Sequence, residues 1–139
     1  MSDVAGRETV SAVELANAFF DAFNREGIES ALRYAVPDGT WHAAPGWAGK
    51  PVYRGGAGAR ELAGEWTEQF DHYRWMPDRS IELSERRALL LAHHSGRTRA
   101  GVPIEGKVAG LFEVEGGRIK EIWFFFSWEE ALEAAEVSE

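Results

Sequence analysis

The first part of the chain carries apolar residues at helical spacing. Ser11 followed by Glu14 is typical of a capping box, and Gly27 offers the left-handed conformation in which helices commonly end. The pattern predicts a first helix over residues 12–25 and a shorter helical stretch over residues 29–35. The apolar face of the first helix consists of Ala12, Ala16, Phe19 and Phe23.

Proline and glycine interrupt the chain before the next helix. Pro37 ends the second helical stretch, and a turn at residues 38–39 leads into a short strand that begins near Thr40. Residues 44–51 contain too many helix and strand breakers for regular structure, which predicts a loop. A third amphipathic helix then ends near Asp71. Its apolar face consists of Ala59, Leu62, Ala63, Trp66 and Phe70.

The remainder of the chain predicts β structure and a short closing helix over residues 129–136. Helices followed by a run of antiparallel strands indicate an α+β fold, with the helices packed on one face of a curved sheet. The length suits a single domain over residues 1–139, with an ordered core over about 8–136. The predicted strands cover residues 73–83, 88–99, 102–115 and 118–128.

Alternation along these strands predicts which side chains lie under the helices. The inward set is Leu89, Leu91, His93, Val108, Gly110, Phe112, Val114, Ile122, Phe124 and Phe126. The opposite set is also largely apolar, and a sheet face of that kind normally needs a cover. We therefore predict a homodimer through it, and cover by the C-terminal helix is the alternative. The opposite set includes Leu90, Ala92, Ala109, Leu111, Trp123 and Phe125.

Charge and composition narrow the classes of partner. The formal net charge of −8 repels phosphate backbones and anionic membrane surfaces, so neither nucleic acid nor a membrane is an expected partner. The absence of cysteine excludes disulfides and thiolate metal ligands, and the start of the chain lacks the pattern of a signal peptide, which favours a cytoplasmic location. Six Trp and eight Phe supply wide apolar surfaces, as expected around a hydrophobic pocket.

Several short sequence segments are similar to those of a known family. They are Phe19–Asn24, Trp41–Gly46, Val52–Gly55 and Phe112–Ile119. These segments resemble SnoaL-like proteins of the nuclear transport factor 2-like superfamily, whose relatives include ketosteroid isomerases, limonene-type epoxide hydrolases and polyketide cyclases. The resemblance implies a cone-shaped barrel whose helices cap a pocket for a small apolar molecule. The residues expected to bind that molecule are Trp41, Phe19, Ala43, Trp75, Gly110, Phe112 and Phe124.

The acids of those relatives are missing at the matching positions. A ketosteroid isomerase carries a tyrosine and two aspartates where this chain has Phe19, Ala43 and Gly110, and the last-strand aspartate of epoxide hydrolases falls near Phe124. None of these four side chains transfers a proton. The resemblance therefore implies the fold and its pocket, but the catalytic residues of the known reactions are not found at the matching positions of this chain.

Two other residues are the candidates for acid/base chemistry. Strand parity places His93 inward, where an imidazole is able to act near neutral pH, and Tyr53 lies near the expected pocket opening, where it can donate a hydrogen bond. A core histidine and a structural tyrosine are the alternatives. His94 is expected to point away from His93, and the four scattered His residues give no metal site and no sign of a cofactor.

Three functions follow from these features. The first is an enzyme of the isomerase, cyclase or hydrolase type that acts on a small apolar or aromatic metabolite, with His93 as acid/base and Tyr53 assisting. The second is a non-catalytic protein that binds a small apolar ligand, because apolar residues replace the carboxylates. The third is an assembly domain that uses the outward face of Trp123 and Phe125.

Overall fold

The computed structural model describes residues 11–136, so the expected beginning of the ordered core at residue 8 lies outside the described residues. The helices are α2 (Ala12–Glu26), α3 (Ile28–Ala31), α4 (Gly55–Thr67) and α5 (Trp128–Ala134), with a 3₁₀ turn at Leu32–Tyr34. The strands are β1 (Ala35–His42), β2 (Val52–Arg54), β3 (Phe70–Glu82), β4 (Arg87–Thr98), β5 (Pro103–Glu115) and β6 (Arg118–Phe125). Within this range no helix is long and apolar enough to cross a membrane.

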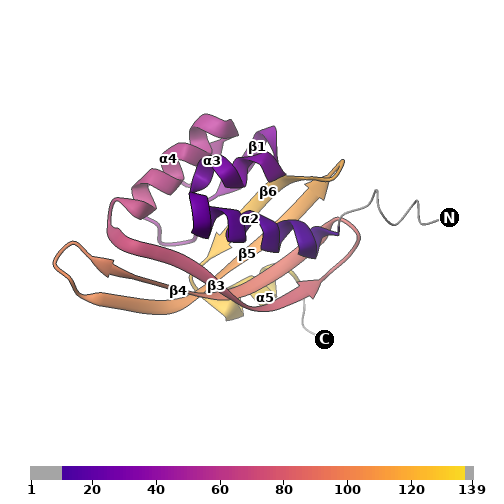
Figure 1. The fold of residues 1–139 in the computed structure, drawn as a ribbon. Coiled ribbons are helices and arrows are strands. Elements are labelled where there is room, and N and C mark those ends of the chain that lie inside the picture. The colour runs from indigo at the N-terminus through magenta and orange to yellow at the C-terminus, as the bar shows by residue number, and fades with distance from the viewer. Residues whose placement is uncertain (1–10, 137–139) are drawn as a thin grey trace.

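The six strands form one curved, open sheet in the order β2-β1-β6-β5-β4-β3. All neighbouring pairs are antiparallel except β1 and β6, which run parallel. Figure 1 shows α2, α3 and α4 over one face of the sheet and α5 on the other side. This architecture confirms the predicted α+β fold, a curved sheet wrapped around the N-terminal helices.

Helix α2 begins with the capping box and ends at the glycine that the sequence indicates. The Ser11 hydroxyl accepts from the backbone N–H of Glu14 at 3.0 Å, and the Glu14 carboxylate accepts from the Ser11 N–H at 3.1 Å. Gly27 ends the helix with φ at +95°, a conformation that strains any residue with a Cβ. The predicted boundaries of this helix are therefore correct to within one residue.

Several predicted boundaries differ from the structure, and the sequence pattern does not indicate strand β2. Strand β1 begins at Ala35 rather than near Thr40, and the predicted turn at residues 38–39 lies inside the strand, where its pairing with β6 is irregular. A Cβ at Gly39 would collide with the ring of Trp41, so glycine serves close packing here rather than a turn. The third helix ends at Thr67, because Phe70 already pairs with Thr98 as the first residue of β3.

The inward assignment is correct for β5 and β6 and wrong for β4. Ala88, Leu90 and Ala92 belong to the core cluster on the helix side, whereas Leu89 and Leu91 pack on the opposite face. The hairpin between β4 and β5 explains the error. The Thr98 N–H donates to the Val102 carbonyl oxygen, and three residues lie between these two. Even-numbered residues of β4 therefore lie opposite even-numbered residues of β5.

Helix α5 covers the central part of the outer sheet face. Cover by this helix is the alternative to the predicted homodimer. Ala131 and Ala135 pack against Leu89, Leu91 and Ala109. The Trp128 indole N–H lies 3.0 Å from the Ala92 carbonyl oxygen and 2.9 Å from that of Val108, which fixes the helix to the sheet. The homodimer stays a prediction, since Trp123 and Phe125 remain half-buried at the margin of this cluster.

A side-chain amide joins α2 to the edge strand β3. The Asn24 Nδ2 donates to the Trp75 carbonyl oxygen at 2.6 Å, and the Trp75 N–H donates to Asn24 Oδ1 at 3.0 Å. In the part of the chain that the structure describes, β3 is an edge strand with β4 as its neighbour. The amide therefore completes the hydrogen bonding of the edge backbone at the position that places Trp75.

Replacing Asn24 with Ala should lower the free energy of unfolding by about 1–3 kcal/mol, because two backbone groups lose their partners. Chemical denaturation measures this loss. Asn17→Ala is the matched control on the same helix, since within the described residues Asn17 bonds the Val13 carbonyl oxygen and the exposed Ser80 hydroxyl. Equal losses for the two variants would contradict the special role of Asn24.

Candidate functional site

A cavity of about 60 Å³ lies between the N-terminal helices and the inner face of the sheet. Its wall is almost wholly apolar. An engineered apolar cavity of roughly 150 Å³ binds benzene, so a ring-sized ligand has to displace side chains here. The lining residues are Phe19, Phe20, Phe23, Ile28, Leu32, Trp41, Ala59, Leu62, Ala63, Trp66, Tyr73, Trp75, Ile122 and Phe124.

Aromatic contacts build the wall from α2 and the sheet. The Phe20 ring stacks on Trp75 with centroids 4.1 Å apart and planes at 1°, and it meets Phe124 edge-on at 6.4 Å. Such pairs add to the stability gained from burial and restrict ring movement. The wall is therefore shaped by α2 and β3 together, at the place where Asn24 joins them.

Four of the residues expected to bind a ligand lie on the cavity wall: Phe19, Trp41, Trp75 and Phe124. The other three do not reach it. Ala43 packs beside the helix-side core just after β1 ends. Phe112 is fully buried behind the wall, and its ring centroid lies 6.3 Å from that of Phe19. A Cβ at Gly110 would lie 2.8 Å from the Phe112 ring.

Tyr53 fastens the loop after β1 and does not line the cavity. Its hydroxyl donates to Glu65 Oε1 at 2.5 Å and accepts from the Lys50 N–H at 3.0 Å and the Trp47 indole N–H at 3.1 Å. Burial and the Glu65 hydrogen bond raise the pKa of Tyr53. These bonds correspond to the structural alternative for Tyr53, and they hold Trp47 stacked on the cavity residue Trp66 at 4.8 Å.

The predicted inward orientation of His93 is wrong. Its ring packs against Trp128 on the α5 side of the sheet, with centroids 5.2 Å apart, and Lys107 Nζ lies 4.6 Å from the centroid of the same indole. Alternation within β4 does not specify which face is inward without the length of the following hairpin, and a shift of one residue reverses every side chain. His93 therefore lies across the sheet from the cavity.

His94 takes the inward place, and it belongs to a short hydrogen-bonded chain. The Trp75 indole N–H donates to the Tyr73 hydroxyl oxygen at 2.9 Å, and this oxygen lies 2.8 Å from His94 Nδ1. Tyr73 and Trp75 line the cavity, and His94 lies behind them. The sequence feature that could have identified the face of His94 is Gly101, because a three-residue hairpin loop commonly has glycine at its left-handed position. In the structure Gly101 has φ at +87°.

Burial controls the ionisation of this pair. It raises the pKa of Tyr73 far above its ordinary value, and it lowers the pKa of His94 below 6.5. A tyrosinate is therefore excluded in the free protein near neutral pH, where the His94 imidazole is uncharged. The pair presents neutral hydrogen-bonding groups to an apolar cavity.

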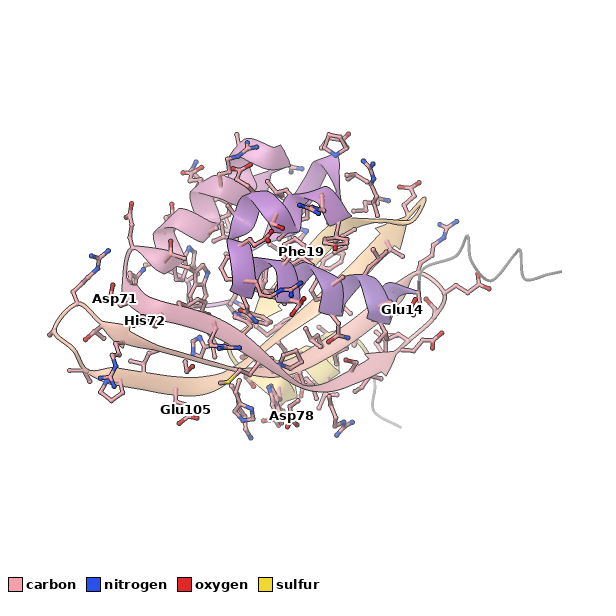
Figure 2. The ribbon with its side chains drawn as sticks, in the orientation of Figure 1. Glu14, Phe19, Asp71, His72, Asp78 and Glu105 are labelled. Carbon is pink, nitrogen blue, oxygen red and sulfur yellow. The ribbon has the colours of Figure 1, made fainter. Side chains whose placement is uncertain are left out.

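No carboxylate of residues 11–136 lines the cavity. Figure 2 shows Glu14, Asp71, Asp78 and Glu105 at the periphery, while Phe19 lies in the helical layer, and these four acids are exposed. Among residues 11–136 no charged side chain is buried. The same range holds no cluster of three or more His, Asp or Glu residues able to bind a metal ion.

The model of the SnoaL-like domain matches residues 16–122, most of the chain. The chain belongs to this family. No curated protein matches its sequence. The matched region includes every lining residue of the cavity except Phe124 and ends at Ile122, within the last strand. The region that matches the family therefore contains most of the helix and strand residues that enclose the cavity.

Solved structures share the fold at low sequence identity. TerC co-crystallised with polyporic acid has a TM-score of 0.75 at 19% identity, covering 90% of this chain and 98% of TerC. A hypothetical protein with a ketosteroid isomerase-like fold from Catenulispora acidiphila, in complex with trimethylamine, has a TM-score of 0.71 at 14% identity, covering 88% of this chain and 92% of that protein. A putative polyketide cyclase from Xanthomonas campestris pv. campestris has 0.74 at 16%, covering 89% and 96%.

Tyr53→Phe should lower the free energy of unfolding by about 1–3 kcal/mol, because the half-buried Glu65 and the Lys50 N–H both lose a partner. Denaturation gives the loss, and hydrogen exchange of the Lys50 amide should become faster. Glu65→Gln keeps an acceptor for the tyrosine and serves as the milder control. Unchanged exchange at Lys50 would show that Tyr53 does not fasten the loop.

Proposed function

We propose that this SnoaL-like pocket protein binds a small, flat, largely apolar molecule in the cavity between α2, α4 and the sheet. The observation that carries the proposal is the aromatic lining, in which Phe20, Trp66, Trp75 and Phe124 offer ring faces and edges. Burying an aromatic molecule against such a wall gains about 25 cal/mol for each Å² of apolar surface.

The chemistry of the wall supports an apolar ligand over an anionic one. No charged side chain of residues 11–136 lines the cavity, so an anionic group would lose its hydration without a cationic partner. The solved neighbour named a putative polyketide cyclase supports a small-molecule pocket in this fold. Binding alone is therefore the function that the geometry favours.

A reaction on the bound molecule is the second candidate. It would be acid/base chemistry of the isomerase, cyclase or hydrolase type, and the observation in its favour is the hydrogen-bonded pair Tyr73 and His94 beside the cavity. Tyr53 and His93, the residues expected from the sequence, lie at the loop and across the sheet. This candidate therefore rests on different residues from those expected.

Naphthalene serves as the probe for binding. Its addition should shift the indole N–H signals of Trp66 and Trp75 in a nitrogen-15 NMR spectrum, because both indoles line the cavity. The Trp128 indole is an internal control, since its N–H is bonded to two carbonyl groups on the other face of the sheet. Equal shifts at Trp128 would indicate unspecific binding.

Filling the cavity should weaken this binding. Ala63→Phe adds a ring at a lining position of α4 and should weaken naphthalene binding at least tenfold, as measured by the same indole shifts. Ala57→Phe adds the same ring at an exposed position of the same helix and should leave the affinity unchanged. Unaltered binding by the Ala63 variant would place the ligand elsewhere.

A further inference from the structure

The hydrogen-bonding groups around Tyr73 restrict each other. An indole N–H only donates, so the Tyr73 oxygen must accept from Trp75 Nε1 at 2.9 Å. When His94 is neutral with Nδ1 unprotonated, the Tyr73 O–H donates to that nitrogen at 2.8 Å. The hydroxyl then has one unused lone pair and no proton for a third partner. In this state the cavity wall offers an acceptor.

Protonation of His94 reverses this character. Nδ1–H then donates to the Tyr73 oxygen, which already accepts from Trp75, so the phenolic proton has to turn to another partner. Tyr73 lines the cavity and His94 does not, so a ligand is the partner within reach. The wall offers a donor in this second state.

The surroundings of His94 leave its titration to burial and to Tyr73. Tyr73 and Trp75 from β3, Gly106 from β5 and Trp66 from α4 face the ring. Tyr73 is the titratable group among them, and the residues beside His94 and Gly106 in the chain, His93, Glu105 and Lys107, belong to the opposite sheet face. Burial lowers the pKa of His94, and no charged side chain of residues 11–136 offsets this effect.

We infer that Tyr73 and His94 form a proton relay at the cavity wall for an aromatic or polycyclic ligand with one phenol, enol or conjugated carbonyl oxygen. The inference rests on the proposed function, since it requires a ligand in the cavity. A ligand O–H donates to Tyr73 while His94 is neutral, and a ligand carbonyl accepts from Tyr73 once His94 carries a proton.

The proton transfer balances without a further reactant. The ligand hydroxyl gives its proton to the Tyr73 oxygen as the phenolic proton moves to His94 Nδ1, which leaves an oxyanion and an imidazolium. The reverse movement returns a proton to the ligand, at the same oxygen or at a conjugated carbon. Return to carbon converts an enol into its ketone, and the protein ends in its starting state.

Three probes of similar shape test the relay: naphthalene, 2-naphthol and 2-acetylnaphthalene. Calorimetry gives their affinities across pH, and NMR of the histidine ring gives the pKa of His94 in the same samples. Above that pKa, 2-naphthol should bind roughly tenfold tighter than naphthalene, and the ketone should show no such gain. As the pH falls through the pKa, the ketone should gain roughly tenfold while naphthalene stays unchanged.

Two variants and one control assign the effect to the pair. Tyr73→Phe should remove the advantage of both oxygen-bearing probes and retain naphthalene binding. His94→Gln should make the affinity of the ketone independent of pH, because glutamine does not titrate. His93→Gln changes the neighbouring residue on the other sheet face, and it should keep the behaviour of the unaltered protein.

The outcomes separate the two proposals. If naphthalene does not bind, the proposed function fails. If naphthalene binds but the ketone gains nothing on acidification, or if His93→Gln alone removes the gain, the relay is wrong. The ring tautomer of His94 in the free protein is a test without variants, because long-range nitrogen-15 spectra should show Nε2–H at neutral pH. A proton on Nδ1 would overturn the inference.

Discussion

The two hydrogen bonds between the Asn24 amide and the backbone of Trp75 set the geometry on which the site depends. They connect the first helix to β3, an edge strand of the described sheet. Trp75 then stacks on Phe20 and donates to Tyr73, which reaches His94. One amide therefore determines both the aromatic wall and the position of the polar pair within it.

The aromatic side chains determine the size of the cavity as well as its polarity. Phe19 and Phe124 occupy the wall where the resemblance to related enzymes leads one to expect a tyrosine and an aspartate. Together with the other rings of the wall, they leave a free volume of about 60 Å³. A ring-sized ligand therefore enters only if the wall moves, and Trp66, which stacks on the loop residue Trp47, is part of that wall.

The sequence predicts most of the elements and four residues of the cavity wall, because periodicity and capping act locally. Phe19 and Phe124 lie on the faces where helix and strand patterns place them, and the family resemblance adds Trp41 and Trp75. The face of β4 was not predictable from alternation, since Leu89, Leu90 and Leu91 are all buried on one side or the other. The roles of Tyr53 and His94 depend on partners distant in sequence, such as Glu65 and Tyr73, which no local pattern specifies.

A neutral tyrosine and histidine pair suits this wall better than a carboxylate. An isolated carboxylate among aromatic rings loses its hydration and stays ionised only at a large cost, so its pKa rises until it takes up a proton. Tyr73 and His94 are neutral near pH 7, and each satisfies the other within the apolar surroundings. The pair therefore keeps a transferable proton at the cavity without a buried charge in the free protein, and charge develops only as a ligand arrives to share it.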